Sequence, residues 1–308
     1  MARIQVLLAT LNGASFLEQQ LDSISSQTAG EIDVLASDDG STDRTLEILA
    51  ARKSQWNKGA FEIVTGPGRG FAQNFRSLVE RSDDSSEYFA FSDQDDVWMP
   101  EKLEQAVRFL ARYKTKPCVF SSASILIDET GTEIGTPSSC RRGPGFRHAI
   151  LQNIAGGNTM VMNREAFNLL RKTSHQIGKL SHDHWLYIIV TAVGGHFEYS
   201  ETPTLFYRQH ANNAIGIKRG SFFKKHMWRL NRYMTGRVRA RTDACLNAIE
   251  ESRELLTEDA KQVLDSCKVL HDGDSMISRL LALRQSGVYR GSASGQCGLW
   301  IDCAFKLK

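Results

Sequence analysis

Short apolar runs alternate with amphipathic segments along the first 113 residues. Four runs have the length of buried strands, at residues 4–10, 32–37, 61–65 and 88–92. Apolar residues at helical spacing follow each run, as Phe16 and Leu21 do after the first. A helix is expected to begin at Asp43 and to place Leu46 and Leu49 on one face. This order predicts a parallel, doubly wound α/β sheet with helices on both faces.

The pattern changes after residue 117. Residues 119–127 predict one long strand, followed by a turn and a hairpin arm at Glu133 and Ile134. Three further strands are expected, one at 158–163 and two within 196–209. Two more helices are expected, from Arg164 and over 183–193. Residues 136–147 are rich in Ser, Pro, Gly and Arg and predict a mobile loop.

Strand signals end near residue 221. Three helices are expected after it, over 222–241, 244–256 and 259–271. The domain boundary is therefore placed near residue 217. It separates a larger domain, 1–217, from a helical region, 218–308, and the larger domain divides into halves at 1–113 and 114–217.

A polar motif follows each of the four strands of the first half. In parallel α/β sheets, ligands bind outside the carboxyl ends of the strands. The motifs are Thr10 with Asn12, Asp38 with Asp39, the Gly-rich turn 66–70, and the acidic cluster 93–96. All four are expected to converge on one crevice.

The acidic cluster Asp93-Gln94-Asp95-Asp96 is the strongest chemical signal. Alternate residues of an extended segment point the same way, so Asp93 and Asp95 share one side. Two adjacent carboxylates repel unless a cation lies between them, and oxygen ligands suit Mg²⁺ or Mn²⁺. The alternative is a solvated acidic loop, but apolar residues on both sides of the cluster argue against it.

Two further motifs suit a nucleotide. Asp38 can accept a hydrogen bond from the imide N–H of uracil or thymine, whereas Ser41 and Thr42 fit helix capping alone. The turn 66–70 with Asn74 suits a phosphate before a helix N-terminus. The pattern is neither the GxGxxG fingerprint nor a P-loop, which disfavours nicotinamide cofactors and P-loop ATPases.

Composition and charge restrict the kinds of partner and the cellular location that can be expected. The net charge is +3, too small to indicate nucleic acid. Residues 218–241 carry nine Lys or Arg residues and no acidic one, interleaved with aromatic residues. This pattern fits either a peripheral membrane contact or a solvated helix that packs its aromatic side on the larger domain. No run of 18 apolar residues occurs. Six cysteines without a CxxC pair suggest reduced thiols and a cytoplasmic location, at most peripheral at the inner face of the membrane.

The motifs ATLN, SDDGSTD, GRGFAQN and FSDQDDVW, in this order, resemble the inverting family-2 glycosyltransferases of the GT-A fold. FSDQDDVW followed by Pro-Glu-Lys-Leu is similar to bacterial rhamnosyltransferase-like members that build surface polysaccharides. The resemblance covers about residues 3–217 and implies a GT-A catalytic domain there. It also implies donor-binding and metal-binding roles. The nucleoside would contact Thr10, Asn12, Asp38 and Asp39; Gly70 and Asn74 would shape the donor pocket; Asp93 and Asp95 would bind metal and diphosphate; and Asp96 would orient them or the donor sugar.

The same resemblance places a catalytic base at Asp183, in the segment Ser181-His182-Asp183-His184. Many relatives carry Glu-Asp where this chain has His-Asp. The rival bases are His182 and His184, which titrate near neutrality. The alternative for Asp183 is the N-cap of the helix that follows.

A later segment, Arg208-Gln209-His210 through Gly216, resembles the relatives' Arg-Gln-His-x-x-Asn-x-x-Gly. It makes His210 a candidate metal ligand or diphosphate contact. Arg208 and Lys218 are candidate phosphate contacts.

The implied activity is transfer of a sugar, with rhamnose as a candidate, from a UDP- or dTDP-sugar to an acceptor hydroxyl with inversion. The acceptor would be a saccharide or a lipid-linked saccharide in cell-surface polysaccharide synthesis. A sugar-1-phosphate nucleotidyltransferase is the first alternative, although residues 10–15 lack the basic side chain that such enzymes place after the first strand. A non-catalytic nucleotide-sugar binding protein is the second.

Overall fold

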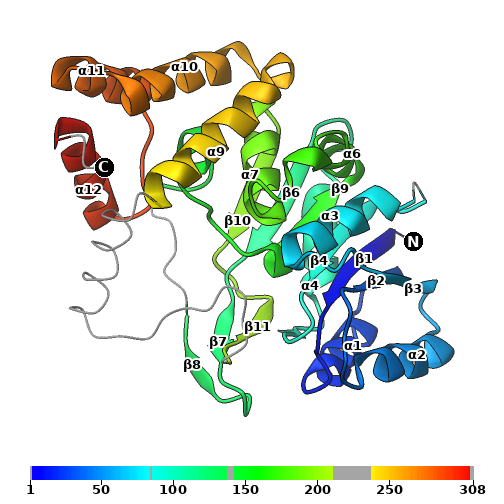
Figure 1. The fold of residues 1–308 in the computed structure, drawn as a ribbon. Helices are drawn as coiled ribbons and strands as arrows, with labels where there is room; N and C mark the ends of the chain where they lie inside the picture. The colour runs from blue at the N-terminus through cyan, green and yellow to red at the C-terminus, as the bar shows by residue number, and fades with distance from the viewer. Residues whose placement is uncertain (1, 84, 137–141, 211–236, 306–308) are drawn as a thin grey trace.

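The computed structural model describes residues 2–83, 85–136, 142–210 and 237–305 (Figure 1). A seven-stranded sheet forms its centre, in the order β10-β6-β9-β4-β1-β2-β3. Its strands are β1 (Arg3–Thr10), β2 (Glu31–Asp38), β3 (Phe61–Thr65), β4 (Tyr88–Ser92), β6 (Cys118–Ser122), β9 (Val161–Asn163) and β10 (His196–Ser200). β1 to β4 are parallel to one another, and β9 runs antiparallel to both β4 and β6. The sheet therefore joins the two halves expected from the sequence.

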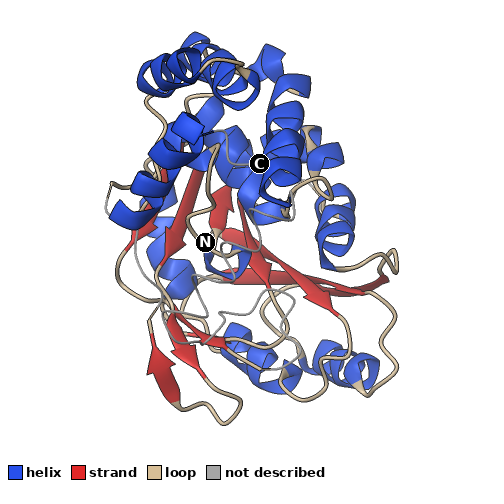
Figure 2. Cartoon of the chain, turned by 60° about the vertical axis from the view of Figure 1, so that its left-hand side comes forward, coloured by secondary structure: helices blue, strands red, loops and turns tan. Residues whose placement is uncertain are grey.

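Helices cover both faces of the large sheet (Figure 2). α1 (Leu17–Ser25), α2 (Thr45–Gln55) and α4 (Lys102–Leu110) pack with Ile4, Val6 and Leu8 of β1. Leu7 points to the other face, where it packs with α3 (Phe71–Arg81), α6 (Arg164–Lys172) and α7 (His182–Ala192). The apolar residues of β1 thus alternate between two cores, because successive side chains of a strand point to opposite faces.

A second sheet has four strands in the order β5-β11-β7-β8. They are β5 (Val97–Trp98), β7 (Ile125–Ile127), β8 (Glu133–Gly135) and β11 (Leu205–Arg208). The prediction of one strand over 119–127 is wrong, because the chain leaves the large sheet at Ser122 and enters the small one at Ile125. All four residues between Phe120 and Ile125 are Ser or Ala, so the apolar run is interrupted at the place where the chain changes sheets.

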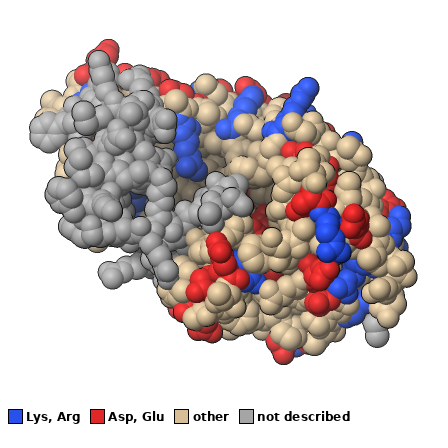
Figure 3. Space-filling view, turned by 60° about the horizontal axis from the view of Figure 1, so that its bottom comes forward, with Lys and Arg blue, Asp and Glu red and all other residues tan. Residues whose placement is uncertain are grey.

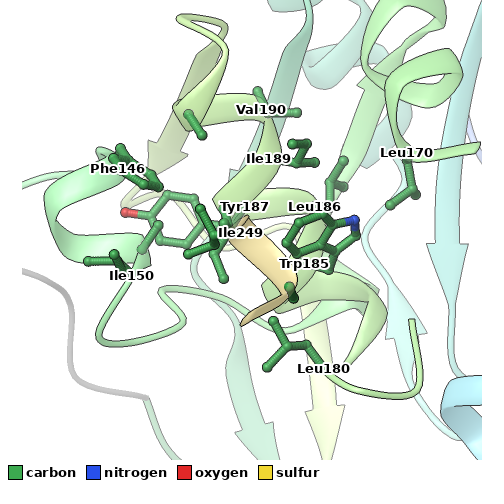
Figure 4. Close-up of a cluster of buried hydrophobic side chains, with 14 of the residues drawn as sticks. Phe146, Ile150, Leu170, Leu180, Trp185, Leu186, Tyr187, Ile189, Val190 and Ile249 are labelled. Carbon is green, nitrogen blue, oxygen red and sulfur yellow. The ribbon is translucent and has the colours of Figure 1, made fainter. Parts of the chain in front are cut away.

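The helical region packs directly on the larger domain. α9 (Arg237–Glu251), α10 (Glu258–Asp272), α11 (Met276–Ser286) and α12 (Ala293–Phe305) follow one another. Ile249 of α9 joins Tyr187 of α7 and Phe146 in one buried cluster (Figure 4). Within the described residues, no helix has both the length and the apolar character needed to cross a membrane.

Several predicted bounds move. Residues 158–163 begin as a 3₁₀ turn, η1 (Gly157–Thr159), and only then become β9. The expected loop 136–147 runs into a short helix, α5 (Phe146–Ala149), and two more 3₁₀ turns are η2 (Ser174–Gln176) and η3 (Arg253–Leu255). α9 runs through the break expected between 241 and 244, while residues 222–236 lie outside the described part of the chain.

The expected packing of the second helix also needs correction. α2 begins at Thr45 rather than Asp43, and Leu46 is 47% exposed. The buried face consists of Thr45, Ile48 and Leu49, which share one side at i, i+3 and i+4.

Candidate active site

The sheet brings the predicted motifs to one edge. β1 lies between β2 and β4, with Thr10 paired to Asp38 and Leu8 paired to Ser92. The three strands therefore end side by side, and the loops after them carry Asn12, Asp39 and Asp93. The expected convergence of these motifs follows from the strand order.

Asp38 organises the loop after β2. Its carboxylate is buried and accepts hydrogen bonds from Thr10 Oγ1 (2.9 Å), Ser41 Oγ (2.6 Å), and the backbone N–H groups of Ser41 (2.8 Å) and Gly40 (3.2 Å). Four donors from the chain itself share its two oxygens. Contact of Asp38 with a base imide stays a prediction.

Asp39 holds the Gly-rich turn. Its two oxygens accept the backbone N–H groups of Gly68 (2.7 Å) and Gly70 (2.8 Å). Gly66 has no room for a side chain, because a Cβ there would lie 2.8 Å from an Asp39 oxygen. Asn74 donates to the Ser37 carbonyl at 2.9 Å, while its Oδ1 is buried with no hydrogen-bond partner among the described residues. The turn is thus fastened to β2 through one carboxylate.

The loop after β1 is tied to both neighbours. Asn12 has φ 50°, and its Oδ1 accepts the Thr42 N–H at 2.9 Å. Gln94 pairs with the Leu11 backbone, accepting its N–H at 2.8 Å and donating to its carbonyl at 2.9 Å. Sequence reasoning singled out the carboxylates around Gln94 but not Gln94 itself, which locks the acidic cluster to the end of β1.

The acidic cluster concentrates negative charge in a buried place. Asp96 is fully buried and accepts from Asn158 Nδ2 (2.6 Å) and the Arg208 N–H (3.2 Å). Burial and the neighbouring Asp95 raise the pKa of Asp96 to about 7. Burial and the charges of Asp96, Asp95 and Asp183 raise the pKa of Asp93 well above its ordinary value. These shifts mean that a cation near the cluster would be strongly stabilised.

Asp95 pairs with His210. Its Oδ2 lies 2.7 Å from His210 Nε2, and the imidazole packs on the Phe16 ring. Within the described residues, no three carboxylate, imidazole or thiol groups gather into a complete metal cage. The donor chemistry still fits Mg²⁺ or Mn²⁺, because such ions use one or two carboxylates and complete their shell with phosphate oxygens and water.

Arg208 is almost completely buried. Its guanidinium donates to the backbone carbonyls of Asp95 (3.0 Å), Asp128 (3.1 Å) and Glu129 (3.1 Å), and it lies over the Phe16 ring. These bonds fix the acidic loop against the β7–β8 hairpin. A direct contact of Arg208 with the donor stays a prediction.

Asp183 lies in the first turn of α7. The helix begins at His182 after the N-cap Ser181, so the alternative that Asp183 is the N-cap is wrong. One Asp183 oxygen accepts from Asn153 Nδ2 at 2.9 Å, and the other accepts the His184 N–H at 2.7 Å. His182, in the same turn, lies with its ring centroid 4.5 Å from that of Phe91 in β4, so this turn lies close to the strand end where the acidic cluster begins.

The two alternative bases, His182 and His184, are buried and held by contacts within the protein. His182 stacks on Phe75 at 3.8 Å, and burial lowers its pKa to about 4. His184 Nε2 lies 2.9 Å from the Ala149 carbonyl, and its Nδ1 lies 3.5 Å from an Arg241 nitrogen. A carbonyl only accepts and a guanidinium only donates, so His184 is the neutral Nε2–H tautomer. These contacts favour Asp183 as the base.

One buried residue near the acidic cluster, Lys102, was not among the candidate residues predicted from the sequence. Lys102, the first residue of α4, is 1% exposed and lies behind the acidic cluster. Its only sequence signal is the Pro-Glu-Lys-Leu segment after the cluster. The candidate phosphate contact Lys218, Gly216, and residues 218–236 of the basic segment lie outside the described residues.

A curated relative supports the glycosyltransferase interpretation. The chain is 29% identical over 218 residues to the dTDP-rhamnosyl transferase RfbG of Shigella flexneri. The match covers 68% of this chain and 73% of that protein.

Solved structures agree on the fold. The crystal structure of residues 1–349 of S. aureus TarS matches with a TM-score of 0.55 and 14% identity, over 93% of this chain and 92% of that one. The same TarS fragment in complex with UDP-GlcNAc matches with a TM-score of 0.55 and 16% identity, over 93% of both chains. At this identity the match establishes the fold, which is the GT-A fold of these glycosyltransferases.

The family model named Glycosyl transferase family 2 matches residues 5–175, more than half of the chain. That range contains every motif from the end of β1 to the Asn158 partner of Asp96. The chain belongs to glycosyl transferase family 2.

Proposed function

We propose that this enzyme transfers a sugar, with rhamnose as the leading candidate, from a UDP- or dTDP-sugar to an acceptor hydroxyl with inversion. The observation that carries the proposal is a packing contact. His182, next to Asp183 in the first turn of α7, lies with its ring centroid 4.5 Å from that of Phe91, and Phe91 lies two residues before Asp93. The proposed base is therefore close to the proposed diphosphate site. The likeness to a dTDP-rhamnosyl transferase supports the choice of donor.

The donor would lie across the ends of β1, β2 and β4. Asp38 and Asp39 hold the loops that surround the nucleoside, with Thr10 and Asn12 beside them. The Oδ1 of Asn74, which has no hydrogen-bond partner within the described part of the chain, offers an acceptor close to the turn that Asp39 holds. Uracil and thymine present the same imide, so these residues suit either nucleotide.

Asp93 and Asp95, with His210, would hold Mg²⁺ or Mn²⁺ together with the diphosphate. When bound, such an ion supplies Lewis-acid stabilisation of the charge on the leaving nucleoside diphosphate. Asp96 supports this site through its bonds to Asn158 and the Arg208 backbone.

Asp183 would act as general base. The acceptor oxygen attacks the anomeric carbon while its proton passes to the Asp183 carboxylate, and the bond from that carbon to the diphosphate oxygen breaks. A single displacement of this kind inverts the anomeric configuration. The bonds from Asn153 and the His184 backbone fix the carboxylate in position.

The proposed acceptor is a saccharide, free or lipid-linked, in cell-surface polysaccharide synthesis. Peripheral membrane contact through 218–241 would suit a lipid-linked acceptor. On the face shown in Figure 3, basic and acidic side chains are interspersed, which does not suit nucleic acid. Co-sedimentation with anionic vesicles tests the contact: the chain should pellet with them at low salt, and failure to do so would remove the membrane proposal.

Donor choice is tested by thermal shift followed by transfer. Melting is measured with UDP, dTDP, UDP-glucose and dTDP-rhamnose, each with Mn²⁺ or Mg²⁺, because a ligand of the native state raises the melting temperature. Transfer from the donor that stabilises most is then followed by nucleoside diphosphate release, and the product anomer is assigned by NMR. Retention of configuration, or no stabilisation by any of the four compounds, would overturn the proposal.

A further inference from the structure

Lys102 occupies a place that lysine rarely takes. Its side chain is 1% exposed, and fully buried lysines are almost always paired. The ammonium donates to the Asn158 carbonyl at 2.9 Å and lies 4.8 Å from the centre of the Trp98 ring. The charge is therefore held by one carbonyl, one aromatic face and its attraction to Asp96.

Asn158 links this lysine to the acidic cluster. Its carbonyl accepts from Lys102, and its side-chain amide donates to Asp96 Oδ2 at 2.6 Å. Burial lowers the pKa of Lys102 to about 7, while the Asp96 charge opposes that shift. Asn158 is thus hydrogen-bonded to both groups at once.

The 3₁₀ turn η1, which contains Asn158, also contacts the helix that carries the proposed base Asp183. Gly157 precedes Asn158 in η1, and a Cβ on Gly157 would lie 2.3 Å from His182 Nε2. η1 therefore packs tightly on the first turn of α7, which carries Asp183. A displacement of Asn158 would therefore move both Asp96 and the turn that holds Asp183.

We propose that Lys102 is a positioning residue, which through Asn158 holds the acidic cluster and the first turn of α7 in one geometry. The inference rests on the proposed function for its catalytic consequence. Its structural part is independent of that function. Lys102 touches neither reacting atoms nor substrate and acts through Asn158 and Asp96.

The first test is local amide hydrogen exchange, which needs no substrate. Lys102→Met keeps the length of the side chain and removes its charge and donors. Peptides covering 93–98 and 153–160 should exchange at least about threefold faster than in the unaltered chain, with peptides of α10 unchanged. Lys53→Met, at an exposed position of α2, is the matched control and should exchange normally throughout. Unchanged exchange in both site peptides of a folded Lys102→Met variant would overturn the proposal.

The second test is rescue. Lys102→Met leaves Asp96 buried without its cation, which is costly, whereas removing both charges relieves the cost. The double variant Lys102→Met with Asp96→Asn should therefore melt at a higher temperature than Lys102→Met alone. Strict additivity of the two substitutions would show that the groups do not act on each other.

The third test separates positioning from stability. With the best donor from the thermal-shift screen, Lys102→Met should lower kcat about tenfold or more and raise the donor KM, because the cluster proposed to hold the diphosphate and the turn that carries Asp183 both lose their geometry. Lys102→Arg should recover part of kcat. A folded variant with full kcat would remove the catalytic consequence. If the unaltered chain shows no transfer, the proposed function is refuted. The positioning role of Lys102 is then decided by the exchange and rescue experiments alone.

Discussion

Asp183→Asn gives the sharpest examination of the proposed chemistry. The substitution keeps the shape of the side chain and removes the charge that would take the acceptor proton. General bases contribute about 10²–10⁴-fold to rate, which corresponds to about 3–5 kcal/mol of activation free energy. Transfer should fall by that factor, measured as nucleoside diphosphate released at saturating donor and acceptor.

The structure also sets a stability cost for this variant. The two Asp183 oxygens now accept from Asn153 and from the His184 N–H. An asparagine has one acceptor oxygen, so its amide nitrogen would face a donor. Asn153 cannot turn round without losing its own bond to the Ile154 N–H at 2.9 Å. One mismatched bond should cost about 1–3 kcal/mol of unfolding free energy, visible in a denaturant melt.

Donor binding separates the two effects. Because Asp183 raises the pKa of Asp93, removing its charge makes Asp93 easier to ionise. The affinity for nucleoside diphosphate with Mn²⁺ should stay the same or rise, as measured by calorimetry. Asp265→Asn, at an exposed ion pair with Arg253 in the helical region, is the control and should keep normal transfer. Transfer above about a tenth of the normal rate in Asp183→Asn would refute Asp183 as the base.

Three further predictions follow from the same geometry. Asp95→Ala should abolish transfer at any Mg²⁺ or Mn²⁺ concentration; transfer restored at saturating metal would remove its role as a ligand. Gly157→Ala should destabilise the fold by about 1–3 kcal/mol in a thermal melt, because its Cβ would overlap the His182 ring; an unchanged melting temperature would show that the ring has room to move. Burial holds the pKa of His148 and His182 near 4, so these two groups lower the unfolding free energy as pH falls from about 6.5 towards 4, whereas the raised pKa of Asp96 acts in the opposite direction there. His148→Gln removes one of the two histidine contributions, so the unfolding free energy of the unaltered chain relative to this variant should decrease from about pH 6.5 towards pH 4 in urea melts; a difference that does not change with pH would contradict this.

Much of the larger domain was predictable because β1, β2 and β4 are buried on both faces. Residues 4–10, 32–37, 61–65 and 88–92 gave mainly apolar runs, and all four are strands within one residue at each end. Their order and parallel direction also fixed the edge where Asp38 meets the acidic cluster. The resemblance named the candidate residues, but their roles as ligands, donor contacts and base stay predictions.

The remaining features depend on contacts that are distant in the sequence. The burial of Lys102 depends on Asn158, 56 residues later, and no periodicity shows that a lysine in a first helical turn points inward. The division of 119–127 likewise depends on the partners of each piece, since β6 pairs with β10 whereas β7 pairs with β11. Leu46 fits a helical face as well as Ile48 does, and only the position of the sheet decides which is buried.

The antiparallel strand β9 has a consequence for synthesis of the chain. It fills the gap between β4 and β6, yet it lies about 70 residues after β4 in the sequence. A nascent chain that has only reached residue 113 therefore exposes one hydrogen-bonding side of β4. The exposed edge of such an intermediate can pair with strands of other chains until β9 leaves the ribosome. A fragment of residues 1–113 is accordingly expected to aggregate, whereas one ending after α7 has every neighbour that β4 requires.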